Sequence, residues 1–139
     1  VTDLAPIIRS LAGIRNHEGN WRGNTIEEMV GTDFSSFLTG NAESIHAEST
    51  PIGYELGGNR ALFKGDYKIV FNRSAVNDQT WHLFNVKIDP GETSDLATED
   101  PERFAEMLAD YEAYVEANDV LPMPEGYNQR REIFRGVLN

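Results

Sequence analysis

Two short β-rich runs joined by a tight turn constrain the fold of this 139-residue chain more than any other feature. Residues 59–63 and 67–71 are rich in aromatic and branched side chains, and the tripeptide Lys64-Gly65-Asp66 joins them. Gly- and Asp-containing linkers of this kind predict an antiparallel hairpin. Because side chains alternate along a strand, the second run places one set of apolar residues on a single face. The hairpin therefore needs a partner that covers this face.

Further elements complete a small α+β domain. Residues 81–86 predict a third strand that adds to the hairpin, and residues 45–55 supply a fourth short strand. Residues 99–117 predict the clearest helix, with Asp100 as its cap and Pro101 in its first turn. Its apolar stripe should cover one face of the sheet, and its acidic residues should face solvent. These acids are Glu102, Glu106, Asp110, Glu112 and Glu116.

The two ends of the chain have different characters. Residues 2–12 predict an amphipathic helix, which Thr2 or Asp3 can cap and which Gly13 ends. Residues 15–33 predict a loop, and residues 34–38 a brief helix. The tail, 122–139, should wrap back as an arm or stay mobile. The fold class is therefore α+β, with three to four antiparallel strands packed against a C-terminal amphipathic helix.

The charge of the chain excludes some partners. There are 23 acidic and 12 basic residues, which gives a formal net charge of -11. Phosphate binding needs clustered Lys and Arg, so we expect no nucleic acid partner and no anionic membrane partner. The acidity favours solubility or, alternatively, a face that attracts cations. There is no cysteine, and no apolar run approaches the about 20 residues that span a bilayer.

Few residues suggest chemistry directly. The three histidines, His17, His46 and His82, are not spaced as metal ligands. His82 lies in a predicted strand and should be structural, whereas His17 and His46 lie in loops, where substrate contact is open. Asp89, Glu92 and Asp95 suggest a calcium loop but lack the alternation and central glycine of an EF-hand. We therefore favour turn and capping roles for them.

The order of three segments adds a resemblance. They are residues 1–14, residues 54–70 (YELGGNRALFKGDYKIV) and residues 81–97 (WHLFNVKIDPGETSDLA), followed by the final helix. Together they resemble the C-terminal region of sulfatases, especially the bacterial arylsulfatases, in the alkaline phosphatase superfamily. The resemblance runs from residue 1 to about 121. The chain departs from the family pattern with Tyr67 in place of Trp, Phe84 in place of Tyr and Asn85 in place of Asp.

The resemblance implies three segments within the chain, and it implies that catalysis belongs to a domain outside it. Residues 1–40 would be the end of the catalytic domain with its connecting loop, 41–121 the C-terminal subdomain, and 122–139 a tail. The full-length enzyme would use a formylglycine nucleophile and a calcium ion. The CxPxR or SxPxR motif that supplies formylglycine is absent here. The resemblance thus implies that the fragment has no catalytic residue, metal or cofactor of its own, and depends on a missing N-terminal catalytic domain.

The loop that leads into the hairpin is the candidate substrate rim. We expect residues 51–60 to reach the cleft in the intact enzyme, with Tyr54, Glu55, Arg60 and the loop residue His46 as candidates. Arg60 suits an anionic substrate or a carboxylate partner. The alternative is a structural ion pair between Arg60 and Glu55.

Other functions and partners stay open at this point. The chain could be a self-standing acidic binding module, or the same subdomain of a phosphonate or phosphate monoester hydrolase. The parent should act on a sulfate ester in the bacterial periplasm or cytoplasm. We expect further sequence before Val1, and self-association through the apolar face of residues 4–11.

Overall fold

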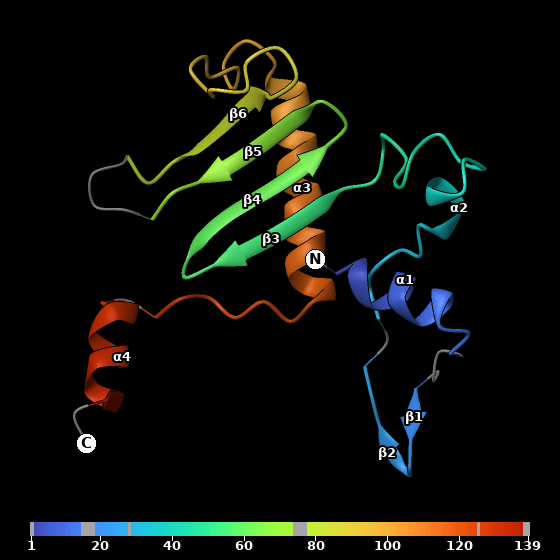
Figure 1. Cartoon of the computed structure of the whole chain (residues 1–139). Helices are drawn as coiled ribbons and strands as arrows, with labels where there is room; N and C mark the ends of the chain where they lie inside the picture. Colours follow the sequence, from blue (N-terminus) through green and yellow to red (C-terminus); the bar gives the residue numbers. More distant parts are fainter. Residues whose placement is uncertain (1, 15–18, 28, 74–77, 125, 138–139) are drawn as a thin grey trace. The chain divides into compact units, whose positions relative to one another are not determined.

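The computed structural model describes residues 2–14, 19–27, 29–73, 78–124 and 126–137 (Figure 1). The chain divides into two compact units, residues 1–47 and 48–139, which we treat separately. Among the described helices, none combines the length and the apolar character that crossing a bilayer requires.

The first unit contains two helices and a very small hairpin. Helix α1 spans Leu4–Leu11 and helix α2 spans Ser35–Leu38, which confirms both predicted helices. The stretch predicted as loop also contains strands β1 (Asn20–Trp21) and β2 (Asn24–Thr25). Their turn forms because Arg22 and Gly23 adopt positive φ angles of 51° and 85°. Two-residue strands carry too little periodicity to be predicted from sequence.

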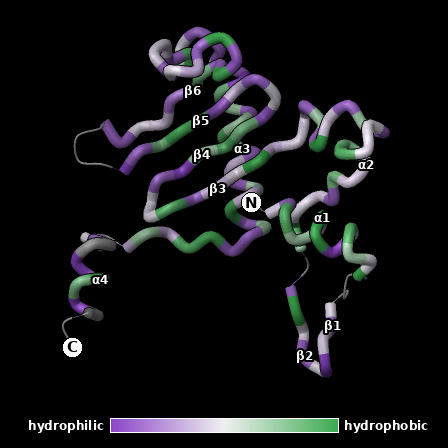
Figure 2. Tube along the Cα trace, in the orientation of Figure 1, coloured by the Kyte–Doolittle hydropathy of each residue, from purple (hydrophilic) through white to green (hydrophobic). Residues whose placement is uncertain are grey.

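Helix α1 keeps much of its apolar face in solvent. Pro6 and Ile7 are buried, whereas Leu4, Ile8 and Leu11 are 52%, 64% and 70% exposed. Figure 2 shows apolar residues recurring along this helix. Self-association through this face stays a prediction.

The second unit is built on a four-stranded antiparallel sheet in the order β3-β4-β5-β6. The strands span Ile52–Leu56, Asn59–Lys64, Tyr67–Phe71 and Trp81–Asn85. The α+β class and the meander are therefore confirmed. A second tight turn joins β3 to β4, in which Gly57 and Gly58 have φ angles of 61° and 88°. Both angles favour glycine, because a side chain is strained in this region.

Helix α3, Pro101–Ala117, packs on one face of the sheet (Figure 1). Its cap is Asp100, whose Oδ1 accepts a hydrogen bond from the Arg103 backbone N–H at 3.2 Å. The core of this face consists of buried residues from three strands and the helix, namely Leu62, Ile69, Leu83, Met107 and Tyr111. This packing confirms the predicted amphipathic helix and its place on the sheet.

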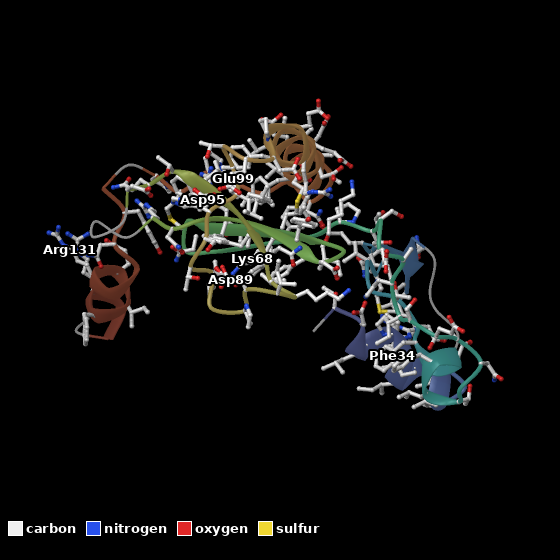
Figure 3. The ribbon with its side chains drawn as sticks, turned by 90° about the horizontal axis from the view of Figure 1, so that it is seen from above. Phe34, Lys68, Asp89, Asp95, Glu99 and Arg131 are labelled. Carbon is white, nitrogen blue, oxygen red and sulfur yellow. The ribbon has the colours of Figure 1, made fainter. Side chains whose placement is uncertain are left out.

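The first part of the segment after β6, which contains Asp89 and Glu92, lies on the opposite side of the sheet from α3. Figure 3 shows Lys68 and Asp89 on that side. The Lys68 ammonium lies 2.6 Å from a Glu92 carboxylate oxygen. Asp89 Oδ2 accepts backbone hydrogen bonds from Thr93 and Ser94, at 2.8 and 2.9 Å. The turn role predicted for Asp89 is confirmed, and Glu92 forms an ion pair.

The tail contains one element that the sequence analysis missed. Helix α4 spans Gln129–Val137. The Asn128 side chain begins it by accepting a hydrogen bond from the Arg131 backbone N–H at 3.1 Å. Asn before a helix is a recognised start signal, but this short segment follows two prolines and is strongly charged.

Candidate functional site

A groove of about 300 Å³ lies where the β3–β4 turn approaches the second half of α3. Glu55 and Arg60 line it from the strands, Tyr111 and Val115 from the helix, and residues 120–123 from the segment that follows. Figure 2 colours much of that segment as apolar. The groove thus combines an apolar wall with one cation and one carboxylate.

Glu55 and Arg60 are cross-strand neighbours in the sheet. The Glu55 carboxylate accepts a hydrogen bond from the Gly58 backbone N–H and so stabilises the β3–β4 turn. The Arg60 guanidinium lies 5.3 Å from the centre of the Phe71 ring, a distance suited to a cation–π contact. A Glu55–Arg60 pair is not among the salt bridges of the described residues.

Tyr111 is the most buried polar residue of the groove. Its side chain is 4% exposed, and its ring lies 4.8 Å from the Trp81 ring in an edge-on contact. The hydroxyl is buried and finds no hydrogen-bond partner among the described residues. Burial raises the pKa of Tyr111, and the positive charge of Arg60 partly opposes this shift. The hydroxyl is therefore a neutral group beside a cation.

Two other sequence candidates lie elsewhere. Tyr54 is 53% exposed and points to the opposite face of the sheet from Glu55, because neighbouring residues of a strand alternate. His46 belongs to the first unit, where its Nε2 lies 3.2 Å from Asp3 Oδ2. Asp3 Oδ1 also accepts a hydrogen bond from the Thr32 N–H, which is the main reason that the pKa of Asp3 is lowered. His17 lies outside the described residues.

Lys64 forms a charged cluster with α3 that the sequence analysis missed. Its Nζ lies 2.6 Å from Glu106 and 2.7 Å from Asp110. The hydrogen bonds that Lys64 donates, to Asp110 first and then to Glu106, raise the pKa of Lys64. The predicted solvent exposure is confirmed for Glu106, whereas Asp110 is half-buried. Four-residue spacing on a helix places both carboxylates beside one strand residue. The cluster ties α3 to β4.

His82 lies between two carboxylates on β6. Its Nδ1 is 2.8 Å from Asp95 Oδ2, and its Nε2 is 3.0 Å from Asp78 Oδ1. These hydrogen bonds, first Asp95 and then Asp78, raise the pKa of His82. Asp95 Oδ1 also accepts hydrogen bonds from the backbone of Leu83 and Ala97. The arrangement fastens the segment after β6 and supports the structural role predicted for His82.

The residues present do not fit the calcium ion or the formylglycine of a sulfatase. Within the part of the chain that the structure describes, no group of three or more His, Cys, Asp or Glu side chains could hold a metal ion. The sequence also has no cysteine to convert.

No protein-family model matches the chain. An uncharacterised sulfatase of Schizosaccharomyces pombe is 24% identical over 127 residues, which cover 91% of this chain and 23% of that protein. The resemblance to sulfatases is confirmed. It is a resemblance to one part of these longer proteins.

Solved structures share the fold. The crystal structure of Ps i-CgsB matches 98% of this chain and 28% of its own, with a TM-score of 0.66 and 24% identity. The structure of BT1596, a 2-O GAG sulfatase, matches 85% of this chain and 25% of its own, with a TM-score of 0.61 and 21% identity. The chain thus spans about a quarter of the length of the proteins that it resembles.

Proposed function

We propose that this chain is the C-terminal part of a sulfatase and helps to shape its substrate cleft without supplying catalytic groups. The observation that carries the proposal is the uneven coverage: nearly all of this chain matches about a quarter of longer proteins that include sulfatases. In the proposed parent, the calcium ion and the formylglycine belong to the remaining three quarters.

The groove with Glu55, Arg60 and Tyr111 is the proposed point of substrate contact. Arg60 is its cation, and a guanidinium binds sulfate or carboxylate oxygens well. Two structural neighbours make a sulfated saccharide the first substrate class to test. One was solved with k-i-k-neocarrahexaose, and the other is a 2-O GAG sulfatase.

The test is the Arg60→Ala variant of the full-length parent. Losing one charge-assisted contact should lower kcat/KM by about tenfold, which corresponds to about 1.4 kcal/mol, with an unchanged unfolding midpoint. Lys87→Ala is the matched control, because Lys87 is also a cation of the second unit but pairs with Asp66, outside the groove.

Two outcomes count against the proposal. If Arg60→Ala alters only stability and leaves kcat/KM intact, Arg60 does not contact the substrate. If the parent hydrolyses a phosphate or phosphonate monoester but not the matching sulfate ester, the chain belongs to a hydrolase of another type.

A further inference from the structure

Two hydrogen-bond donors of the groove have no acceptor among the described residues. The Tyr111 hydroxyl is buried and unpaired, on a residue that is only 4% exposed. The Arg60 guanidinium contacts the Phe71 ring, and no salt bridge or hydrogen bond of its N–H groups is found within the described part of the chain. Buried polar groups in native proteins are nearly always paired, so an unpaired one calls for a partner from outside.

The charge of Arg60 is unpaired although the chain is rich in acids. Acidic residues outnumber basic ones by 23 to 12. Glu55, the cross-strand neighbour of Arg60, accepts instead from the Gly58 N–H. The cation–π contact with Phe71 leaves the guanidinium N–H groups available for an acceptor. An anionic group would therefore find a local positive charge in a chain of net charge -11.

The two donors select the same kind of group. Both line the groove, and burial raises the pKa of Tyr111 more than the nearby charge of Arg60 lowers it. The hydroxyl therefore keeps its proton at neutral pH and can donate it in a hydrogen bond. A hydroxyl beside a guanidinium favours a ligand group whose oxygens only accept, which describes a sulfate or an ionised carboxylate.

The apolar wall of the groove is fastened at both ends. The Val120 N–H donates to the Val115 carbonyl at 3.0 Å, and the Pro124 carbonyl accepts from the Arg73 guanidinium at 3.2 Å. Residues 121–123 line the groove between these two points. Its volume of about 300 Å³ lies at the lower end of the range for small-molecule sites, about 300–1,000 Å³. The groove thus suits one anionic group and the carbon atoms next to it.

We infer that the groove binds one oxyanion of the substrate, a sulfate or a carboxylate, between the Tyr111 hydroxyl and the Arg60 guanidinium. The carbon atoms next to the oxyanion lie against residues 121–123. This inference deepens the proposed function and rests on it for calling the ligand a substrate group. It adds Tyr111 as a residue that contacts the ligand, and it defines the chemical class of the group that enters the groove.

Ligand titration of the 139-residue chain tests the site without the parent enzyme. The chain has two tryptophans, and Trp81 contacts the Tyr111 ring, so a Trp21→Phe background leaves Trp81 as the reporter. Glucose 6-sulfate and glucuronate are the probes, and comparing them shows whether the oxyanion is a sulfate or a carboxylate. At least one should change the Trp81 fluorescence in a saturable way. Glucose, which carries no charge, should not.

Substitutions in this background assign the two donors. Tyr111→Phe should weaken probe binding by about tenfold, because one hydrogen bond to a charged group is lost, while its urea midpoint stays equal or rises. Arg60→Ala should abolish detectable binding, and Arg60→Lys should restore part of it. Tyr114→Phe is the matched control, because this tyrosine of α3 lies 5.8 Å from the Tyr111 ring but outside the groove lining. It should bind the probe as tightly as the background chain.

Three results would overturn the inference. The first is that neither probe binds, or that glucose binds as tightly as the better probe. The second is that Tyr111→Phe binds the probe as tightly as Tyr114→Phe. The third is a strong loss of stability in Tyr111→Phe, which would show that another part of the polypeptide already accepts from the hydroxyl.

The proposed function fails by a different result. If the chain binds a probe through Tyr111 and Arg60, but Arg60→Ala leaves kcat/KM of the full-length parent intact, the oxyanion site stands and its role as a substrate contact is rejected.

Discussion

The two faces of the four-stranded sheet bury their residues to very different degrees. On the α3 face, Leu62, Ile69 and Leu83 are each 0% exposed beneath a helix of 17 residues. On the opposite face, Ala61, Val70 and Phe84 are buried near the centre, while Phe63 and the apolar residues of β3 remain exposed. The helix face should therefore carry most of the stability of this unit, and the other face is available for contacts with partners.

Neighbouring residues of β4 give the largest test of this comparison. Leu62→Ala should lower the free energy of unfolding by about 2–5 kcal/mol, because it leaves a cavity in the core. Phe63→Ala, on the partly exposed face, should cost about 1 kcal/mol. Urea unfolding followed by tryptophan fluorescence measures both. Equal losses would show that the two faces contribute alike.

The next largest effect on stability is expected at the β6 edge of the sheet, where the Asp95 carboxylate binds backbone amides. Asp95→Ala should cost about 1–2 kcal/mol, because the Leu83 and Ala97 amides lose their acceptor. Asp78→Ala removes an exposed partner of His82 and of the Thr80 N–H, and should cost less than Asp95→Ala. The comparison of their urea midpoints is the measurement. A larger loss for Asp78→Ala would contradict this account of the β6 edge.

On the α3 face, one substitution of Tyr111 is expected to maintain or raise stability rather than lower it. Tyr111→Phe should leave stability unchanged or raise it by up to about 1 kcal/mol, because a buried hydroxyl without a described partner is removed. Tyr111→Ala should instead cost about 3–5 kcal/mol, since the ring contact with Trp81 is lost. If Tyr111→Phe is strongly destabilising by thermal unfolding, the hydroxyl has a partner.

The smallest expected effect is a pH dependence of stability that comes from His82, on the face of the sheet opposite α3. The pKa of His82 in the folded chain is raised above 6.5, so protonated His82 stabilises the fold. This stabilisation is fully present below pH 6.5 and is lost as pH rises through the folded pKa. As pH rises above 6.5, the unmodified chain should therefore lose more stability than His82→Gln. Urea midpoints across this range measure the difference. Parallel curves would show that His82 does not contribute.

Much of the second unit could be predicted from sequence, because its signals are local. Alternation predicts β4 and β5, the linker Lys64-Gly65-Asp66 predicts their turn, and Asp100-Pro101 predicts the start of α3. The Gly57-Gly58 turn was missed as a hairpin signal, so β3 was placed only approximately within 45–55. Strand β3 begins at Ile52 and ends at Leu56.

The candidate site was only partly predictable. Glu55 and Arg60 were identified because they lie in the Gly-containing segment that leads into the hairpin, but alternation alone could have placed Tyr54 on the other face. Tyr111 belongs to the apolar stripe predicted for residues 99–117. Its place in the groove was missed, because residues 120–123 form the facing wall only in three dimensions. The Lys64 cluster likewise depends on the packing of α3 over β4.

The most direct test of the proposed function measures sulfate release by the 139-residue chain and by its full-length parent. Both would be incubated with an aryl sulfate and with a sulfated saccharide, with calcium present. We predict turnover by the parent and none above background by the chain alone. Sulfate release by the isolated chain would contradict the account, because it would place a nucleophile within these residues.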